Sequence, residues 1–280
     1  MGDERAELKL PDALLAKLKW TNSAESRKTF LLTGMVGVGK TLMAQVLAEA
    51  IVGPGKTFLM DFPEEEGTDS LGDYATPYYT FTSQRDLDEW YPALVAAKPE
   101  AIIWDSIPSA YTVFMRERAP SGVPPEDRGK TWMAVAIALR REIIRFKMIP
   151  SVKVFIGTSL VWPDNDEITG REGRLQVTLP GALKSNIYGL FSFDLNLLMD
   201  AGPDGRATRV IEFQPTPRSV ARVRAPLSAK IPARMAYNLE DPKQPGRLNY
   251  GTVRKILELL RIEPHKDFGA EAQSPLQVGG

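Results

Sequence analysis

The chain has 280 residues, of which 43% are hydrophobic and 25% are charged, and its formal net charge at pH 7 is zero. Such a composition is typical of a globular protein, and the length is enough for one large α/β domain or two small ones. Cysteine is absent and His265 is the single histidine. The absence of cysteine excludes disulfides and thiolate zinc sites, and one histidine argues against histidine-based triads or metal clusters. Without an apolar run of ~18 residues or a secretory signal, we expect a cytoplasmic protein.

The charges are unevenly distributed along the chain. Residues 1–139 contain 14 basic and 20 acidic residues, whereas residues 140–261 contain 20 basic and 12 acidic residues. A basic second half is compatible with a surface that meets an anion such as nucleic acid. Ordinary solvated surface charge explains the asymmetry equally well.

Strands and helices alternate through the first two thirds of the sequence. The expected strands are Phe30–Thr33, Lys56–Asp61, Tyr78–Thr82, Ala101–Asp105 and Val152–Thr158. The expected helices between them are Thr41–Val52, Asp86–Ala97 and Thr131–Lys147. This alternation predicts an α/β fold with a mostly parallel sheet that helices cover on both faces.

The character of the sequence changes after residue 186. Three consecutive strands, Phe191–Met199, Ala207–Phe213 and Ser219–Arg224, predict an antiparallel extension at the C-terminal side of the same sheet, and Asn249–Arg261 predicts a last helix. We therefore divide the chain into a polar, helical lead-in (1–28), an α/β core (29–235), a C-terminal helical extension (236–262) and a disordered tail (263–280).

One motif in the first third carries specific chemistry. Gly34 to Thr41 matches the phosphate-loop pattern G-x-x-x-x-G-K-[ST], between an expected strand and an expected helix. Glycines let the backbone N–H groups turn toward phosphates, Lys40 can reach the β- and γ-phosphates, and the Thr41 hydroxyl can ligate Mg²⁺. We therefore predict a site for ATP and Mg²⁺. The expected nucleotide-binding residues are Gly34, Met35, Val36, Gly37, Val38, Gly39, Lys40, Thr41 and Leu42.

Acidic residues that complete such a site can be sought at strand ends. Asp105 ends an apolar strand and is a candidate to hold Mg²⁺ through water, although an acid in this place can also be a helix cap. Ser106 and not a glutamate follows it, so the carboxylate that activates water is expected after the second strand, where Asp61, Glu64, Glu65 and Glu66 lie. Our first candidate there is Glu64 and the next is Glu65, within an acidic run that is also typical of a solvated surface.

This order of elements resembles the RecA superfamily of P-loop ATPases. In that family the catalytic glutamate follows the strand after the phosphate-loop helix, where Glu64 lies with an offset of one position. The family also places a polar residue that senses the γ-phosphate at the end of a later strand, and Thr158 or Ser159 has that position. The segment Thr178–Lys184, with its Leu-Pro-Gly-x-x-Lys pattern, is most similar to the compact phage nucleotide-binding ATPases that anneal single strands.

The resemblance implies an ATPase that acts on single-stranded DNA in recombination, by annealing or strand exchange, as a homo-oligomeric filament or ring. A phage protein of this kind would work in the host cytoplasm. The implied DNA contacts are Arg171, Arg174 and Lys184, and the implied residues that reach a neighbour's ATP are Arg222 and Arg224, with Lys230 as a further candidate. Two alternatives remain open, a DNA-translocating motor or helicase and an ATP-gated assembly protein.

Overall fold

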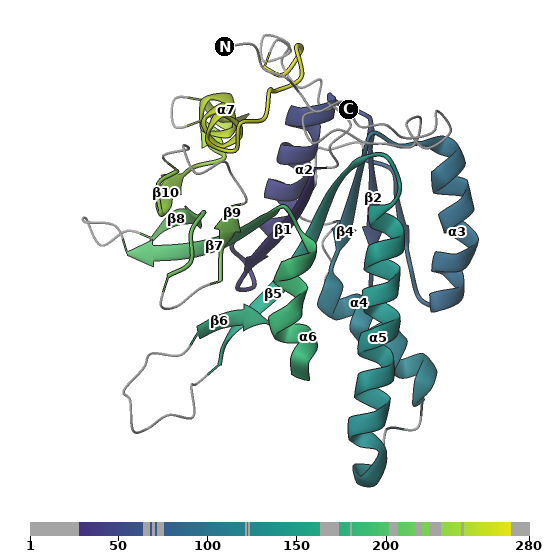
Figure 1. Cartoon of the computed structure of the whole chain (residues 1–280). Coiled ribbons are helices and arrows are strands. Elements are labelled where there is room, and N and C mark those ends of the chain that lie inside the picture. Colours follow the sequence, from purple (N-terminus) through teal and green to yellow (C-terminus); the bar gives the residue numbers. More distant parts are fainter. Residues whose placement is uncertain are drawn as a thin grey trace, which may run out of the picture.

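A single large sheet organises the protein (Figure 1). The computed structural model describes residues 28–63, 68, 71, 76–120, 122, 124–162, 174–179, 181–201, 207–216, 220–223, 231–241 and 244–269. The strands of the sheet follow the order β10-β8-β7-β1-β5-β4-β2-β3, with β6 paired to β5 and β9 paired to β7. A separate two-stranded sheet consists of β11 and β12.

The bounds of these elements are as follows. The strands are β1 Thr29–Gly34, β2 Thr57–Asp61, β3 Tyr78–Thr80, β4 Ala101–Asp105, β5 Val152–Trp162, β6 Arg174–Val177, β7 Phe193–Ala201, β8 Ala207–Glu212, β9 Arg222–Val223, β10 Arg234–Tyr237, β11 Glu240–Asp241 and β12 Gln244–Leu248. The α-helices are α2 Lys40–Val52, α3 Gln84–Ala97, α4 Ile107–Arg118, α5 Arg128–Lys147, α6 Gly181–Asn186 and α7 Tyr250–Leu259, with 3₁₀ turns at Pro125–Asp127 and Ile187–Leu190.

The centre of the sheet is parallel. β1 lies between β5 and β7 and runs parallel to both, and β4, β2 and β3 continue the parallel part beyond β5. β5 therefore separates β1, which leads into the phosphate loop, from β4, which ends at Asp105. Beyond β7, the strands β8 and β10 are antiparallel to their neighbours. The fold is the mixed α/β arrangement that the sequence predicts, with a mostly parallel central sheet flanked by helices.

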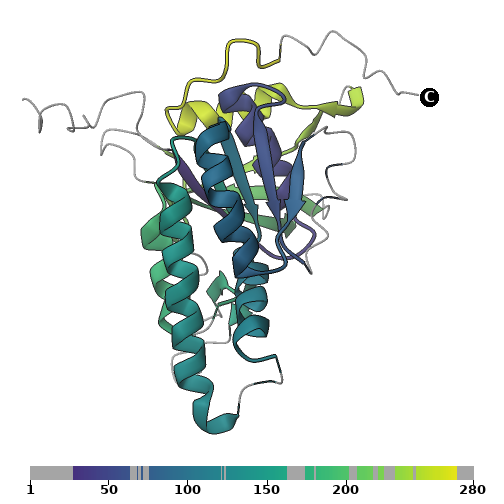
Figure 2. The same cartoon turned by 90° about the vertical axis from the view of Figure 1, so that its right-hand side faces the viewer.

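Helices cover both faces of the sheet, and side chains of β1 alternate between the two cores. Phe30 and Leu32 pack on the face covered by α2 and α7, whereas Leu31 packs on the face covered by α3 to α6. All six residues of β1 are buried, as expected for a parallel strand with helices on both sides. The turned view shows the long α5 extending beyond the sheet (Figure 2).

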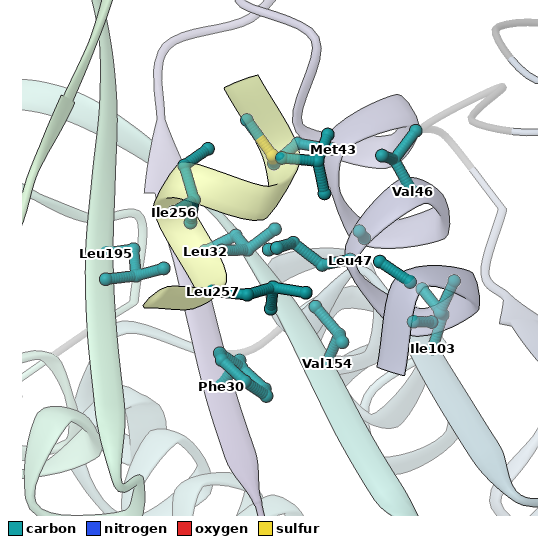
Figure 3. Packing of buried hydrophobic residues seen from close by; sticks show 14 of the residues in the cluster. Phe30, Leu32, Met43, Val46, Leu47, Ile103, Val154, Leu195, Ile256 and Leu257 are labelled. Atoms are coloured by element: carbon teal, nitrogen blue, oxygen red, sulfur yellow. The ribbon is translucent and has the colours of Figure 1, made fainter. Parts of the chain in front are cut away.

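The C-terminal helix α7 is part of the first core. It begins at Asn249, whose side chain accepts a hydrogen bond from the backbone N–H of Thr252 (3.1 Å), as helix caps do. Ile256 and Leu257 pack in one core cluster with Leu47 of α2 and with side chains of β1, β5 and β7 (Figure 3). Burying such side chains is worth ~2 kcal/mol each, so α7 helps to hold the phosphate-loop helix against the sheet.

Several elements differ from the sequence-based expectations. The helix α4 was not predicted, and Ser106 starts it by accepting a hydrogen bond from Ser109 N–H, with Pro108 in the first turn where proline is tolerated. The expectation that the extension begins as an antiparallel strand is wrong for β7, which is parallel to β1. The expected strand Ser219–Arg224 is described only as the short β9, and β10 to β12 were not predicted.

Candidate functional site

The phosphate-loop residues form the connection from β1 to α2 at the carboxyl edge of the sheet. Gly37 and Gly39 have φ values of 81° and 85°, a left-handed conformation that favours glycine. Gly39 is also the N-cap of α2 and supplies no side-chain cap to the first turn. The N-terminus of α2 therefore keeps amide groups of the kind that bind phosphate.

Lys40 is 7% exposed and lies under the loop. Its Nζ donates a hydrogen bond to the backbone oxygen of Met35 (3.0 Å). This contact holds the ammonium group inside the turn of the loop, close to the position where the sequence motif requires a cation for phosphate.

Thr41 and Asp105 meet although 64 positions separate them in sequence. The Thr41 hydroxyl donates to Oδ2 of Asp105 at 2.6 Å, and Asp105 is 1% exposed. Hydroxyl and carboxylate oxygens are the hard ligands that suit Mg²⁺. The alternative that Asp105 caps a helix does not describe α4, because Ser106 is its cap. The donor set beside the loop therefore fits a magnesium ion.

Asp61, one of the acids expected after the second strand, lies close to these residues. In the parallel pairing of β2 with β4, Asp61 lies opposite Asp105, so both acids are at the same edge. Asp61 is 8% exposed and accepts a hydrogen bond from the Thr80 hydroxyl (2.9 Å). The sequence does carry a signal for it, since Asp61 ends an apolar strand just as Asp105 does. Our first candidates, Glu64 and Glu65, lie outside the described residues.

Thr158 lies beside the start of the loop. It pairs with Gly34 in the parallel register of β5 and β1, and its backbone oxygen accepts hydrogen bonds from the N–H (2.8 Å) and hydroxyl (2.9 Å) of Thr178. β5 continues beyond the predicted end as far as Trp162. Thr158 therefore lies within β5 and not at its end as expected, and the γ-phosphate role stays a prediction.

Arg222 is engaged within its own chain. Its guanidinium donates to the backbone oxygen of Tyr188 (2.8 Å) and lies 3.5 Å from the carboxylate of Asp194. Asp194 pairs with Leu31, three residues before Gly34. The guanidinium is therefore held at Tyr188 and Asp194 and not at the phosphate loop of its own chain. The other two candidates for reaching a neighbour, Arg224 and Lys230, lie outside the described residues.

The expected DNA contacts fall on β6 and α6. Arg174 begins β6, where its backbone pairs with Trp162, and Lys184 is half-buried in α6. The two elements contact each other, which brings these two expected positions into one region. Arg171 lies outside the described residues, and DNA binding stays a prediction for all three.

Comparisons with known proteins add little beyond the fold. No family model matches the chain, and no curated protein matches it. A solved structure that does match is a KaiC-like protein from the hyperthermophilic archaeon Pyrococcus horikoshii OT3, with a TM-score of 0.43 and 14% identity over 75% of this chain and 89% of that chain. A likeness at this level carries no argument about function, which has to come from the site itself. Among the described helices, none is long and apolar enough to cross a membrane.

Proposed function

We propose that the protein binds ATP with Mg²⁺ and hydrolyses it at the Gly34–Thr41 loop. The observation that supports this most is the 2.6 Å hydrogen bond from Thr41 to Asp105, which joins the loop to the acid at the end of β4. Lys40 lies under the same loop, and Gly37 and Gly39 have the left-handed backbone that a phosphate cradle needs.

In this proposal each group has a separate role. The loop amides and Lys40 bind the phosphates, and Thr41 and Asp105 hold Mg²⁺, which when bound neutralises charge on the phosphates. A carboxylate must also orient the attacking water. Asp61 is the described candidate, beside Asp105 in the sheet, and Glu64 and Glu65 are the candidates from the sequence.

The test is ATP turnover by purified full-length protein. Lys40→Ala should lower turnover by at least ~100-fold and weaken ATP binding, since it removes a charge-assisted contact to phosphate. Lys255→Ala is the matched control, because Lys255 is exposed on α7 and away from the loop. Normal turnover by Lys40→Ala, with a folded circular-dichroism spectrum, would contradict the proposal.

The water-orienting carboxylate can be assigned by single-turnover kinetics. Asp61→Asn, Glu64→Gln and Glu65→Gln are nearly isosteric changes that remove one negative charge each. The variant at the correct position should keep ATP affinity and lose the chemical step. If all three hydrolyse ATP normally, the carboxylate lies elsewhere.

We further propose single-stranded DNA as the polymer on which this ATPase acts. The basic balance of residues 140–261 supports it, as does the placement of Arg174 and Lys184 on contacting elements. The phage-type resemblance behind this idea rests on the sequence alone. Neutralising Arg171, Arg174 and Lys184 should flatten the slope of log affinity against log salt by up to ~0.7 per lost contact.

The competing proposal is an ATP-gated assembly protein. ATP turnover measured with and without single-stranded DNA separates the two, because stimulation is expected only from a DNA-dependent ATPase. ATP-dependent change in oligomer size without any DNA binding would favour assembly, and strand displacement coupled to hydrolysis would favour a motor.

A further inference from the structure

The β7–β8 hairpin continues past the phosphate loop. β1 ends at Gly34 opposite Leu197, whereas β7 runs on to Ala201 and pairs with the beginning of β8. β10 lies on the other side of β8. These three strands therefore stand beside the loop as a wall, which Figure 1 shows next to β1 and α2.

One row of side-chain positions crosses this wall. Arg209 in β8 pairs with Met199 in β7 on one side and with Tyr237 in β10 on the other. Neighbours on paired strands share a face of the sheet. Ile211, two positions after Arg209, packs in the core with α2, so the row lies on the face that carries the phosphate-loop helix.

Two members of the row reach the loop itself. The Tyr237 hydroxyl donates to the backbone oxygen of Val38 (3.4 Å). A Cβ placed on Gly39 would lie 4.0 Å from Nε of Arg209. Burial raises the pKa of Tyr237 to about 12, and the nearby charge of Arg209 acts in the opposite direction. The guanidinium is thus close to the residue that directly precedes Lys40.

Arg209 differs from other arginines in the bonding of its guanidinium. Arg145, Arg222 and Arg234 each pair with a carboxylate, at 2.5, 3.5 and 3.1 Å respectively. Within the described residues, Nε of Arg209 is buried and has no hydrogen-bond partner. A buried charged N–H without a partner is costly, so a ligand that supplies an acceptor there would remove the cost.

We infer that Arg209 binds the phosphate chain of the nucleotide held by the loop of the same chain. The inference rests on the proposed function. A guanidinium presents fixed, parallel N–H donors that match phosphate oxygens, and Arg209 approaches the loop from the β8 side. Arg209 is a binding residue that acts in cis, distinct from any basic residue that a neighbouring chain supplies.

The test compares Arg209→Gln with Arg234→Gln. Arg234 is an exposed residue of the same sheet that pairs with Asp200, so its variant controls for losing a positive charge in this part of the molecule. Binding of ATP, ADP, adenosine and tripolyphosphate to full-length protein is measured by calorimetry with Mg²⁺. A charged hydrogen bond is worth ~1.5–3 kcal/mol, which corresponds to a ~10–150-fold loss.

We expect that loss for ATP, ADP and tripolyphosphate with Arg209→Gln, no change for adenosine, and changes below twofold for Arg234→Gln. The ligand-free Arg209→Gln protein should unfold at the same temperature as the wild type or a higher one, because the buried Nε has no hydrogen bond to lose among the described residues. Unchanged affinity for the phosphate ligands, or an equal loss for adenosine, would overturn the inference. If the wild type shows no Lys40-dependent ATP binding, the proposed function fails first, and this outcome is distinguishable from a failure at Arg209 alone.

Discussion

Charged side chains have different kinds of partner on the two faces of the sheet. On the face of α3 to α6, charges neutralise each other: Glu142 is fully buried in α5 and forms ion pairs with Arg141 and Arg145. On the face of α2 and α7, charged groups gather at the carboxyl edge, where Lys40 binds a backbone oxygen and a buried N–H of Arg209 has no partner in the described part of the chain. Internal pairing indicates a structural role for Glu142, whereas the N–H of Arg209 beside the phosphate loop fits the ligand inferred above.

This contrast can be tested, because variants on one face should change activity and variants on the other should change stability. The largest effect is expected for Asp105→Asn. Removing the carboxylate that would hold Mg²⁺ should lower hydrolysis by ~10³-fold, or about 4 kcal/mol, with most of the ATP affinity kept. Turnover measured against Mg²⁺ concentration checks it, and an unchanged magnesium dependence would make Asp105 a purely structural residue.

The corresponding variant on the other face is Glu142→Gln. Glu142 neutralises Arg145, which also contacts Asp88 and lies over the ring of Tyr91. Removing one partner of a buried ion pair costs ~3 kcal/mol, so the midpoint of urea denaturation should fall while turnover per folded molecule stays constant. A large loss of turnover at unchanged stability would break the contrast between the faces.

A site could be predicted from the sequence when its residues lie close together along the chain. The residues from Gly34 to Thr41 are contiguous, so their pattern shows the loop directly, and an acid after an apolar strand shows Asp105. Arg209 could not be found in this way, because its place beside Gly39 depends on the register of β8 against β7 and β10. The parallel direction of β7 is likewise set by a long-range pairing with β1, which no local pattern encodes.

A smaller effect is expected for Arg222→Gln. The change removes one partner from the buried carboxylate of Asp194, which should cost ~1–2 kcal/mol. Denaturation measures this cost. The same variant also tests whether Arg222 completes the ATP site of a neighbouring chain. If it does, a mixture of the Arg222→Gln and Lys40→Ala proteins should recover turnover, and otherwise it should not. No recovery in mixtures shown to co-assemble would assign Arg222 to structure alone.

The smallest effect is expected at the start of α3. Ser83 and Asp86 form a capping box, in which Ser83 Oγ accepts from Asp86 N–H and the Asp86 carboxylate accepts from Ser83 N–H. Ser83→Ala should cost ~1 kcal/mol without any change in turnover. A change in turnover would show that the two faces are coupled.

The same cap predicts a pH dependence. Burial alone would raise the pKa of Asp86, but hydrogen bonds from Thr82 and Ser83 outweigh it and lower that pKa below its ordinary value. A lowered folded-state pKa means that the stabilisation is present at neutral pH and is lost as the pH falls through the folded pKa. Asp86→Asn should therefore reduce the loss of stability on acidification, as measured by denaturation between neutral and acidic pH.

The two ends of the phosphate loop contact the wall of β7, β8 and β10, and this limits where those ends can move. A Cβ on Gly34 would lie only 2.4 Å from the backbone oxygen of Leu197, and Val38 is tied to Tyr237. The tip between them faces solvent, since Val36 is 79% exposed. A shift of the loop ends on ligand binding would therefore reach β7 through Gly34 and β10 through Tyr237.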